Sequence, residues 1–296
     1  MRDVGGRFGF DDLRLDARPL PERLPRFVPQ TDGTGIAELD AQLGWPAYAV
    51  GLRRIFSPSS HRIVPRFTGT TAHRALGLPA DRLAVLVGYG EDPLVEAFWT
   101  RRHRDGLLEA IASQHWDLVL APNYSIYGNW PRVEHLLNMR RSLLVASELA
   151  ERGVPVVPNL YWYRLEDLTR WNTWIRQQTN MPGIAVNLQT VRQPADWDSW
   201  ALPGLTWLSV HLPPDLPVVL TGLSRADRIS LMVELFGDRL IVVSQNPHQY
   251  ALHGAVMTPD GRRDVHAHKA DAFAATVHYM AHLLEPHWNS DGGIDQ

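Results

Sequence analysis

Four apolar runs in this sequence end in polar and aromatic side chains of the kinds that bind sugars, nucleosides or exposed bases. The runs 117–127 and 154–163 both pass from β-branched residues through Pro-Asn into aromatic residues, and the runs 184–189 and 240–246 end in amides. Amides both donate and accept hydrogen bonds, and aromatic rings offer flat faces for stacking. If the runs are parallel strands, their polar ends meet at one edge of a sheet, where α/β folds place their sites.

The predicted site divides into catalytic and binding residues. The predicted catalytic residues are Asp92, Asn123, Asn159 and Tyr127. Asp92 would act as acid or base, the two asparagines would orient a substrate, and Tyr127 would stack or donate. The predicted substrate-binding residues are Tyr124, Ser125, Tyr161, Asn187, Gln189, Gln245, Asn246 and His248. The alternative is structural: each Pro-Asn phrase only shapes a turn, and Asp92 serves a turn in the same way.

An anion site is predicted where a late strand meets a helix. Ser224 and Arg225 lie in this connection, where barrels often bind phosphate through backbone amides and an arginine adds a fork of donors. The alternative is that Ser224 only caps the helix. His266 and His268 would share one face of a strand, but no third histidine lies close in sequence. We therefore assign no metal ligand, and the cofactor stays unknown.

Glycoside hydrolysis is poorly supported by the carboxylates. Glycosidases need two carboxylates at a defined separation, whereas the strand ends here hold amides. Glu166 and Asp167 follow an aromatic strand end, but they read better as negative charges in the first turn of a helix.

Composition excludes several further classes of function. The chain has 296 residues, 45% of them hydrophobic, with a net charge of −3, so no global basic field indicates nucleic acid. The absence of cysteine excludes disulfides, thiolate catalysis and thiolate metal sites. The N-terminus lacks an apolar signal stretch, and no run approaches the roughly 20 apolar residues that span a bilayer. We expect a cytoplasmic protein with no membrane partner.

Strands and helices alternate clearly from residue 83 onward. The expected strands are 47–52, 83–88, 117–122, 154–158, 184–188, 206–211, 217–221 and 239–244. The expected helices are 71–78, 93–114 with a break near Gly106, 131–152, 165–178, a turn at 196–200, 224–236 and 270–284. Pro131 and Gly153 bracket the longest helix, as proline and glycine commonly do.

This alternation predicts an α/β fold: a (β/α) barrel-like parallel sheet with outer helices and an extended N-terminal arm. Seven or eight strands favour a barrel over an open sheet, and the segment after the strand at 83–88 lacks the three-glycine dinucleotide motif. We expect a Pro/Arg-rich arm over 1–45, a single barrel-like domain over 46–290 and a flexible tail over 291–296.

The stretch 83–222 resembles the family of the domain of unknown function 4417, found in bacterial, phage and mobile-element proteins. The resemblance rests on the acidic and aromatic segment 89–99, the phrase 121–127 and the phrase 157–162, in this order and spacing. It implies the architecture and a mobile-element setting. The family's phrase carries an aspartate where Asn123 stands here, and an asparagine cannot act as a base.

Two functions are open at this point. The first is an enzyme, a hydrolase for example, that acts on a nucleotide, a nucleic-acid end or a sugar at the carboxyl ends of the strands. The second is a non-catalytic protein that binds nucleic acid or a protein partner in replication or host interaction. A pocket with dry walls and a buried carboxylate would favour the enzyme, and a shallow arginine-rich groove would favour nucleic-acid binding.

Overall fold

The computed structural model describes residues 2–285, and the tail expected over 291–296 lies outside them. Nine strands form one sheet in which every pair is parallel. They are β1 (Phe27–Thr31), β2 (Ala47–Gly51), β5 (Leu83–Val87), β6 (Leu118–Leu120), β7 (Val156–Val157), β8 (Asn159–Leu160), β9 (Ile184–Asn187), β10 (Val218–Thr221) and β11 (Leu240–Ser244). Their order is β7-β6-β5-β2-β1-β11-β10-β9-β8.

The sheet curls until its two ends nearly meet. β7 and β8 stand at opposite ends of the strand order, yet only Pro158 separates them in the chain. Val156 pairs with Val119 of β6 on one side, and Leu160 pairs with Val186 of β9 on the other. A proline interrupts strand hydrogen bonding because it has no N–H, so this strand divides while still bridging both neighbours. The predicted barrel-like α/β fold is confirmed.

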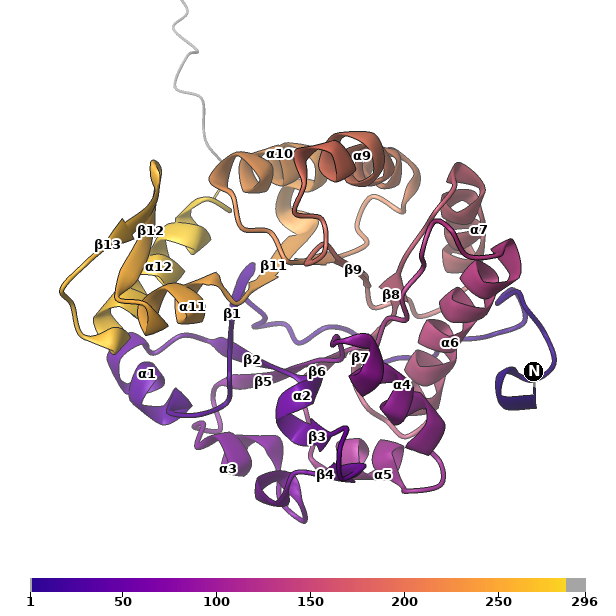
Figure 1. Ribbon diagram of the computed structural model, residues 1–296, viewed down its shortest axis with the longest axis horizontal. Helices are drawn as coiled ribbons and strands as arrows, with labels where there is room; N and C mark the ends of the chain where they lie inside the picture. The colour runs from indigo at the N-terminus through magenta and orange to yellow at the C-terminus, as the bar shows by residue number, and fades with distance from the viewer. Residues whose placement is uncertain (1, 286–296) are drawn as a thin grey trace, which may run out of the picture.

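Helices surround the sheet in Figure 1. They are α1 (Ile36–Leu43), α2 (Leu52–Ile55), α3 (Ala72–Leu76), α4 (Asp92–Arg101), α5 (Leu107–Ser113), α6 (Arg132–Ala150), α7 (Leu165–Arg176), α8 (Pro194–Asp196), α9 (Leu202–His211), α10 (Ala226–Phe236), α11 (Asn246–Leu252) and α12 (Lys269–His282). Two small hairpins lie outside the barrel sheet: β3 (Phe56–Ser57) with β4 (Arg62–Ile63), and β12 (Ala255–Thr258) with β13 (Gly261–Asp264). None of the described helices combines the length and apolar character needed to cross a membrane.

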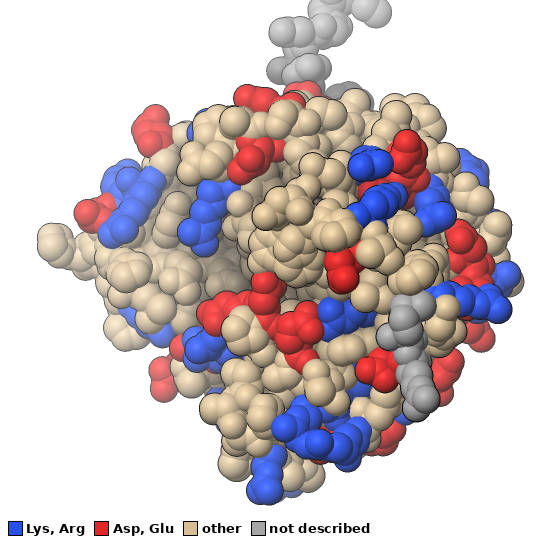
Figure 2. All heavy atoms as spheres, turned by 45° about the vertical axis from the view of Figure 1, so that its right-hand side comes forward, with Lys and Arg blue, Asp and Glu red and all other residues tan. Residues whose placement is uncertain are grey.

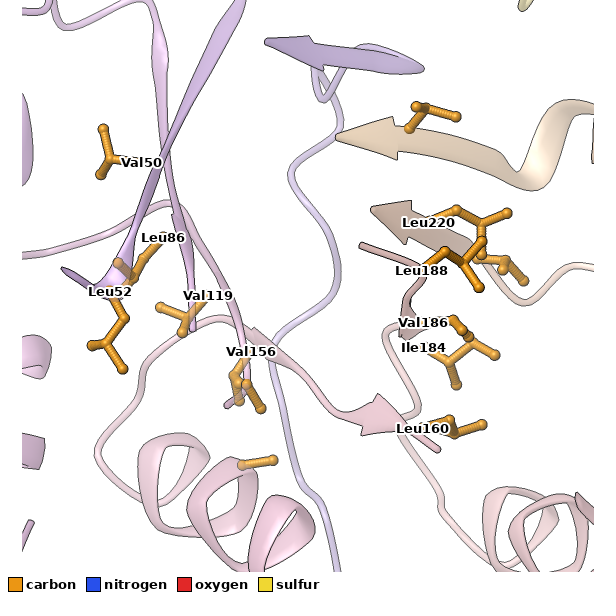
Figure 3. Packing of buried hydrophobic residues seen from close by; sticks show 14 of the residues in the cluster. Val50, Leu52, Leu86, Val119, Val156, Leu160, Ile184, Val186, Leu188 and Leu220 are labelled. Atoms are coloured by element: carbon orange, nitrogen blue, oxygen red, sulfur yellow. The ribbon is translucent and has the colours of Figure 1, made fainter. Parts of the chain in front are cut away.

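Alternate residues of the strands build two separate cores. The barrel interior holds small and branched side chains: Val28, Ala47, Ala49, Val85, Val87, Leu118, Leu120, Val157, Ala185, Val219, Ile241 and Val243. Residues of the opposite parity, such as Val50, Leu86 and Val119, belong to the larger core that also contains helix residues (Figure 3). Side chains of period two point to opposite faces of a strand, so each strand serves both cores.

The N-terminal segment is anchored at both ends of its path. Phe10 is buried and stacks on Trp171 of α7, with ring centroids 4.0 Å apart. Leu20 and Leu24 pack against the interior core beside Leu83, which begins β5. The amino ends of the strands lie at this level, so the segment closes the barrel opposite the edge where ligands bind in such folds.

The extended arm is shorter than predicted. Residues 27–31 form β1 between β2 and β11, and residues 36–43 form α1. Pro29 concealed the strand in the sequence because proline is rare in central strands. The strand tolerates it because β1 pairs with β11 over 27–29 and with β2 only over 30–31.

We expect Leu24→Ala to lower the free energy of unfolding by about 1–2 kcal/mol, because it removes apolar atoms from a half-buried site at the barrel floor. Urea denaturation followed by tryptophan fluorescence measures the change. Arg23→Ala is the matched control, since Arg23 is exposed, and a loss of equal size in that variant would contradict the packing argument.

The strand predicted at 206–211 is wrong, because these residues belong to helix α9. Leu205, Leu208 and Leu212 are buried at a spacing of three to four residues, which places them on one helical face. The sequence Thr-Trp-Leu-Ser-Val-His also alternates, which gave the strand prediction. A helix here supplies the crossover between the parallel strands β9 and β10.

The expected start of helix α10 is also corrected. The helix begins at Ala226, its N-cap is Arg225 rather than Ser224, and no side chain caps it. The hairpin β12–β13 and helix α11 were not predicted, although the pair Asp260-Gly261 beside the hairpin turn is a recognisable signal.

Candidate functional site

Loops at the carboxyl ends of the strands enclose a cavity of about 400 Å³, which we call the mouth cavity. β1, β2, β5, β9 and β11 all contribute to it, directly or through the loops that follow them. Its lining is Gln30, Thr31, Asp32, Gly51, Arg53, Arg54, Val87, Tyr89, Gly90, Glu91, Gln189, Thr190, Arg192, Gln245, His248 and Gln249. The cavity therefore lies where sites are expected in parallel α/β barrels.

Asp32 and His248 lie next to each other in the lining of this cavity. His248 Nε2 lies 3.6 Å from Asp32 Oδ1, and the imidazole side chain is 2% exposed. Nε2 is buried and has no hydrogen-bond partner among the described residues. His248 lies in the first turn of α11, which starts two residues after β11 ends, and Pro247 is well suited to this turn. Buried polar atoms without a partner are uncommon, so this nitrogen is a candidate functional group.

Burial controls the protonation of this pair. Desolvation lowers the pKa of His248, more than the carboxylate of Asp32 raises it, and Lys269 and Arg54 lower it further. Burial would raise the pKa of Asp32, but hydrogen bonds from Thr34 and the positive charges nearby leave that pKa below its usual range. At neutral pH the pair is a neutral imidazole beside a carboxylate, an arrangement that can accept a proton.

Further unpartnered polar atoms face the barrel interior. Gln30 and Asn159 each lie two residues beyond a member of the interior core, so their side chains point into the barrel. Gln30 Oε1, both amide atoms of Asn159 and the Tyr89 hydroxyl are buried without a hydrogen-bond partner in the described residues. Burial alone raises the pKa of Tyr89, which keeps its hydroxyl protonated and able to donate.

A second cavity of about 400 Å³ adjoins the first and shares Gln189, Arg192, Gln245 and Gln249 with it. We call it the arginine cavity because Arg192, Arg225 and Arg228 line it with Ser224 and Asn246. The predicted anion-binding residues Ser224 and Arg225 therefore line one cavity. Figure 2 shows a hollowed face with basic and acidic side chains on its borders.

The three arginines differ in how they are held. Arg225 forms a bidentate pair with Asp227, and Arg228 donates to the carbonyl of Val191 while its guanidinium lies 4.3 Å from the ring centre of Trp197. The guanidinium of Arg192 has no partner among the described residues and is exposed. Arg192 is therefore the donor most free to meet an anion.

Asp92, the predicted acid, lies in a separate cluster. Its carboxylate accepts hydrogen bonds of 2.5 Å from Ser125 and from Tyr127. The bond to Asp92 raises the pKa of Tyr127 above its ordinary value. The structure thus brings Asp92, Ser125 and Tyr127 together, but both carboxylate oxygens already have protein donors.

The remaining predicted residues are dispersed around the rim. Asn187 Oδ1 accepts from Thr221 and from the backbone of Gln189. Asn246 donates to the carbonyl of Ser224. Tyr124 is 1% exposed and packs in the outer core against Arg141, and neither it nor Asn123 lines the mouth or arginine cavity.

Sequence reasoning missed Asp32, Arg53 and Arg54. Asp32 follows β1, which the prolines concealed, and the arginines lie in the one-turn helix after β2. The available signal was the phrase Gln30-Thr-Asp-Gly33, which ends an apolar run as the other strand-end phrases do. Arg53 pairs with Glu91 at 2.7 Å, and Arg54 lies 4.0 Å from Asp32.

In the described part of the chain, no group of three or more histidine and carboxylate side chains could hold a metal ion. Compared with family models and with curated proteins, the sequence matches none of them. The resemblance to the domain of unknown function 4417 stays a prediction from its motifs.

Proposed function

We propose that this chain is an enzyme that binds a phosphorylated small molecule, a nucleotide or a sugar phosphate, at the mouth of the barrel. The observation that carries the proposal is the buried His248, whose Nε2 has no hydrogen-bond partner and lies 3.6 Å from Asp32 in a cavity. In this proposal His248 accepts a proton from the substrate or from an attacking water, and Asp32 stabilises the imidazolium that forms.

The arginine cavity supports an anionic ligand. Three positive charges line it, on Arg192, Arg225 and Arg228. Asp227 neutralises the charge of Arg225. Guanidinium forks match phosphate oxygens, and the cavity adjoins the connection from β10 to α10, a common place for phosphate in barrels. Because the two cavities share Gln189, Arg192, Gln245 and Gln249, one ligand can meet the arginines and His248 together.

The test is a melting and turnover experiment on the full chain with inorganic phosphate, ribose 5-phosphate and AMP. We expect these ligands to raise the melting temperature, with a stabilisation of about 2.7 kcal/mol at 100 times Kd. Arg192→Gln should lose most of this stabilisation, and the exposed Arg74→Gln should keep it. Phosphorus-31 NMR of the same mixtures, with and without added Mg²⁺, follows turnover. If none of the ligands raises the melting temperature, the proposal is contradicted. If a ligand binds but is not turned over, the chain is a binding protein and not an enzyme for that ligand.

A second candidate, a nucleic-acid binding protein, is favoured by an open groove of about 840 Å³ between the β3–β4 hairpin and α4–α5. Arg62, Arg101 and Arg104 line it, although Asp105 pairs with both Arg101 and Arg104. An electrophoretic-shift assay with single- and double-stranded oligonucleotides tests this candidate. Binding that weakens steeply with salt and depends on Arg62 would favour it.

A further inference from the structure

A third cavity, of about 270 Å³, lies on the far side of the loop that borders the mouth. We call it the aromatic cavity, and its lining is Ile126, Gly128, Tyr161, Tyr163, Thr190, Val191, Asp196 and Trp200. Thr190 also lines the mouth cavity, and Val191 also lines the arginine cavity. One short loop therefore borders all three spaces.

The aromatic walls of this cavity are held in place. Trp200 stacks on Trp162 with ring centroids 4.7 Å apart and donates from its indole nitrogen to the Trp162 carbonyl at 3.0 Å. Tyr161 lies 5.1 Å from Trp200 at an interplanar angle of 32°. A wall fixed before binding loses little entropy when a flat ligand stacks on it.

Tyr163 covers the cavity from the side of α6. Its ring packs 4.8 Å from that of His135. A Cβ at Gly128 would lie only 3.1 Å from the Tyr163 ring, so the absence of a side chain at Gly128 makes room for this ring. Tyr163 is 42% exposed, so part of its side chain is accessible to a ligand.

Charge separates this cavity from the arginine cavity. Its charged lining residue is Asp196, whose carboxylate has no hydrogen-bond or ion-pair partner in the described chain. Burial raises the pKa of Tyr161 to about 12, and the charge of Asp196 adds to this, so the phenol keeps its proton. A carboxylate only accepts hydrogen bonds. The cavity therefore suits a flat group that donates N–H bonds, and it disfavours phosphate.

We propose that the aromatic cavity is the nucleobase subsite and that the substrate class is a nucleotide whose base carries an amino group. This rests on the proposed function, because the phosphate of the same molecule lies in the arginine cavity. The base stacks between Tyr163 and the Tyr161–Trp200 wall, and its amino group donates to Asp196. Guanine presents two N–H donors side by side and suits the carboxylate best, whereas uracil has no amino group.

Calorimetric titration of the full chain with GMP, UMP, ribose 5-phosphate and guanosine tests this assignment. We expect GMP to bind more tightly than ribose 5-phosphate, and Tyr163→Leu to weaken GMP by about 5- to 150-fold, the range found for stacked bases. Asp196→Asn should weaken GMP more than UMP. The controls are Trp130→Leu, an exposed aromatic residue outside the cavity lining, and Asp198→Asn, an exposed carboxylate in the following turn.

The outcomes separate the two proposals. Equal affinity for GMP and ribose 5-phosphate, unchanged by Tyr163→Leu, would overturn the base subsite and leave phosphate binding intact. Guanosine that binds as tightly as GMP and depends on Tyr163 would support the subsite and count against the phosphate site. A panel in which no ligand binds would overturn both. Binding of ribose 5-phosphate that Tyr163→Leu weakens as much as it weakens GMP would assign the wall to the sugar instead.

Discussion

Replacement of His248 by glutamine should lower kcat/KM for the phosphorylated ligand by about 10²- to 10⁴-fold, the usual contribution of a general acid or base. Glutamine keeps a polar side chain of similar size in the buried position but cannot accept and return a proton. The ligand should still stabilise the variant against heat, because the arginines remain. Phosphorus-31 NMR measures turnover, and the melting temperature measures binding.

The pH profile gives a second measure of the same residue. Burial holds the pKa of His248 below its ordinary value of about 6.5. The base is therefore neutral at pH 7, and kcat/KM should fall only as the pH falls through the lowered pKa. The remaining activity of His248→Gln should lack this acid limb. His253→Gln, an exposed histidine just after α11, should keep the wild-type rate and profile.

The free energy of unfolding should also fall as the pH becomes acidic. Because the folded-state pKa of His248 lies below the value of about 6.5 in the unfolded chain, the unfolded chain binds more protons at acid pH. The contribution of His248 to stability is complete above the unfolded-state pKa of about 6.5 and is lost as the pH falls through the lower folded-state pKa.

Full turnover in His248→Gln, with an unchanged pH profile of kcat/KM, would show that this imidazole does not transfer the proton.

The sequence predicted the barrel because its strand-end phrases and helices repeat with a regular spacing. β6, β9 and β11 carry continuous apolar runs, the pattern of parallel strands that are buried on both faces. The errors fall where local chemistry competes with this pattern. Pro29 hid β1, and an alternating stretch at 206–211 concealed a helical face that only packing reveals.

Part of the lining of the mouth cavity could be predicted for the same reason. His248, Gln189 and Gln245 follow visible strands, and all three line the mouth cavity. Asp32 follows the hidden strand, so the partner of His248 could not be inferred. The direction of a strand-end side chain could not be predicted either. Asn159 and Tyr124 are both strand-end residues, yet Asn159 faces the barrel interior and Tyr124 faces the outer core. Alternate residues of a strand face opposite sides of the closed sheet, so the direction of each side chain depends on the exact register of the strand. That register is known only from the three-dimensional structure.

Replacement of Asp167 by asparagine should lower the free energy of unfolding by about 3–5 kcal/mol, the usual effect of removing one partner from a buried ion pair. Asp167 is 0% exposed and pairs through both carboxylate oxygens with Arg132, the first residue of α6. It also accepts from the backbone N–H groups of Tyr163 and Arg164 at 2.9 and 3.0 Å. One carboxylate thus joins α6, α7 and the turn after β8, and the substitution leaves the guanidinium without its charge partner.

The acid sensitivity of the fold should change with this residue. Burial would raise the pKa of Asp167, but the hydrogen bonds from Arg132 and from the two backbone groups outweigh it and lower that pKa. Its stabilisation is complete above the unfolded-state pKa of about 3.9 and is lost as the pH falls through the lower folded-state value. Urea denaturation at pH 7 and at pH 3 measures both effects. Glu166→Gln, an exposed neighbour, should change stability by less than about 0.5 kcal/mol.

The same variant connects the fold to the base subsite. Asp167 holds the backbone of Tyr163, and Tyr163 forms one wall of the aromatic cavity. In Asp167→Asn this wall loses its charged anchor, so GMP should lose its advantage over ribose 5-phosphate even at temperatures where the variant is folded. Phosphate affinity should stay as in the wild type, because Arg192 and Arg228 line the arginine cavity and not the aromatic cavity. Loss of both affinities in equal measure would show general loosening of the fold rather than loss of one wall.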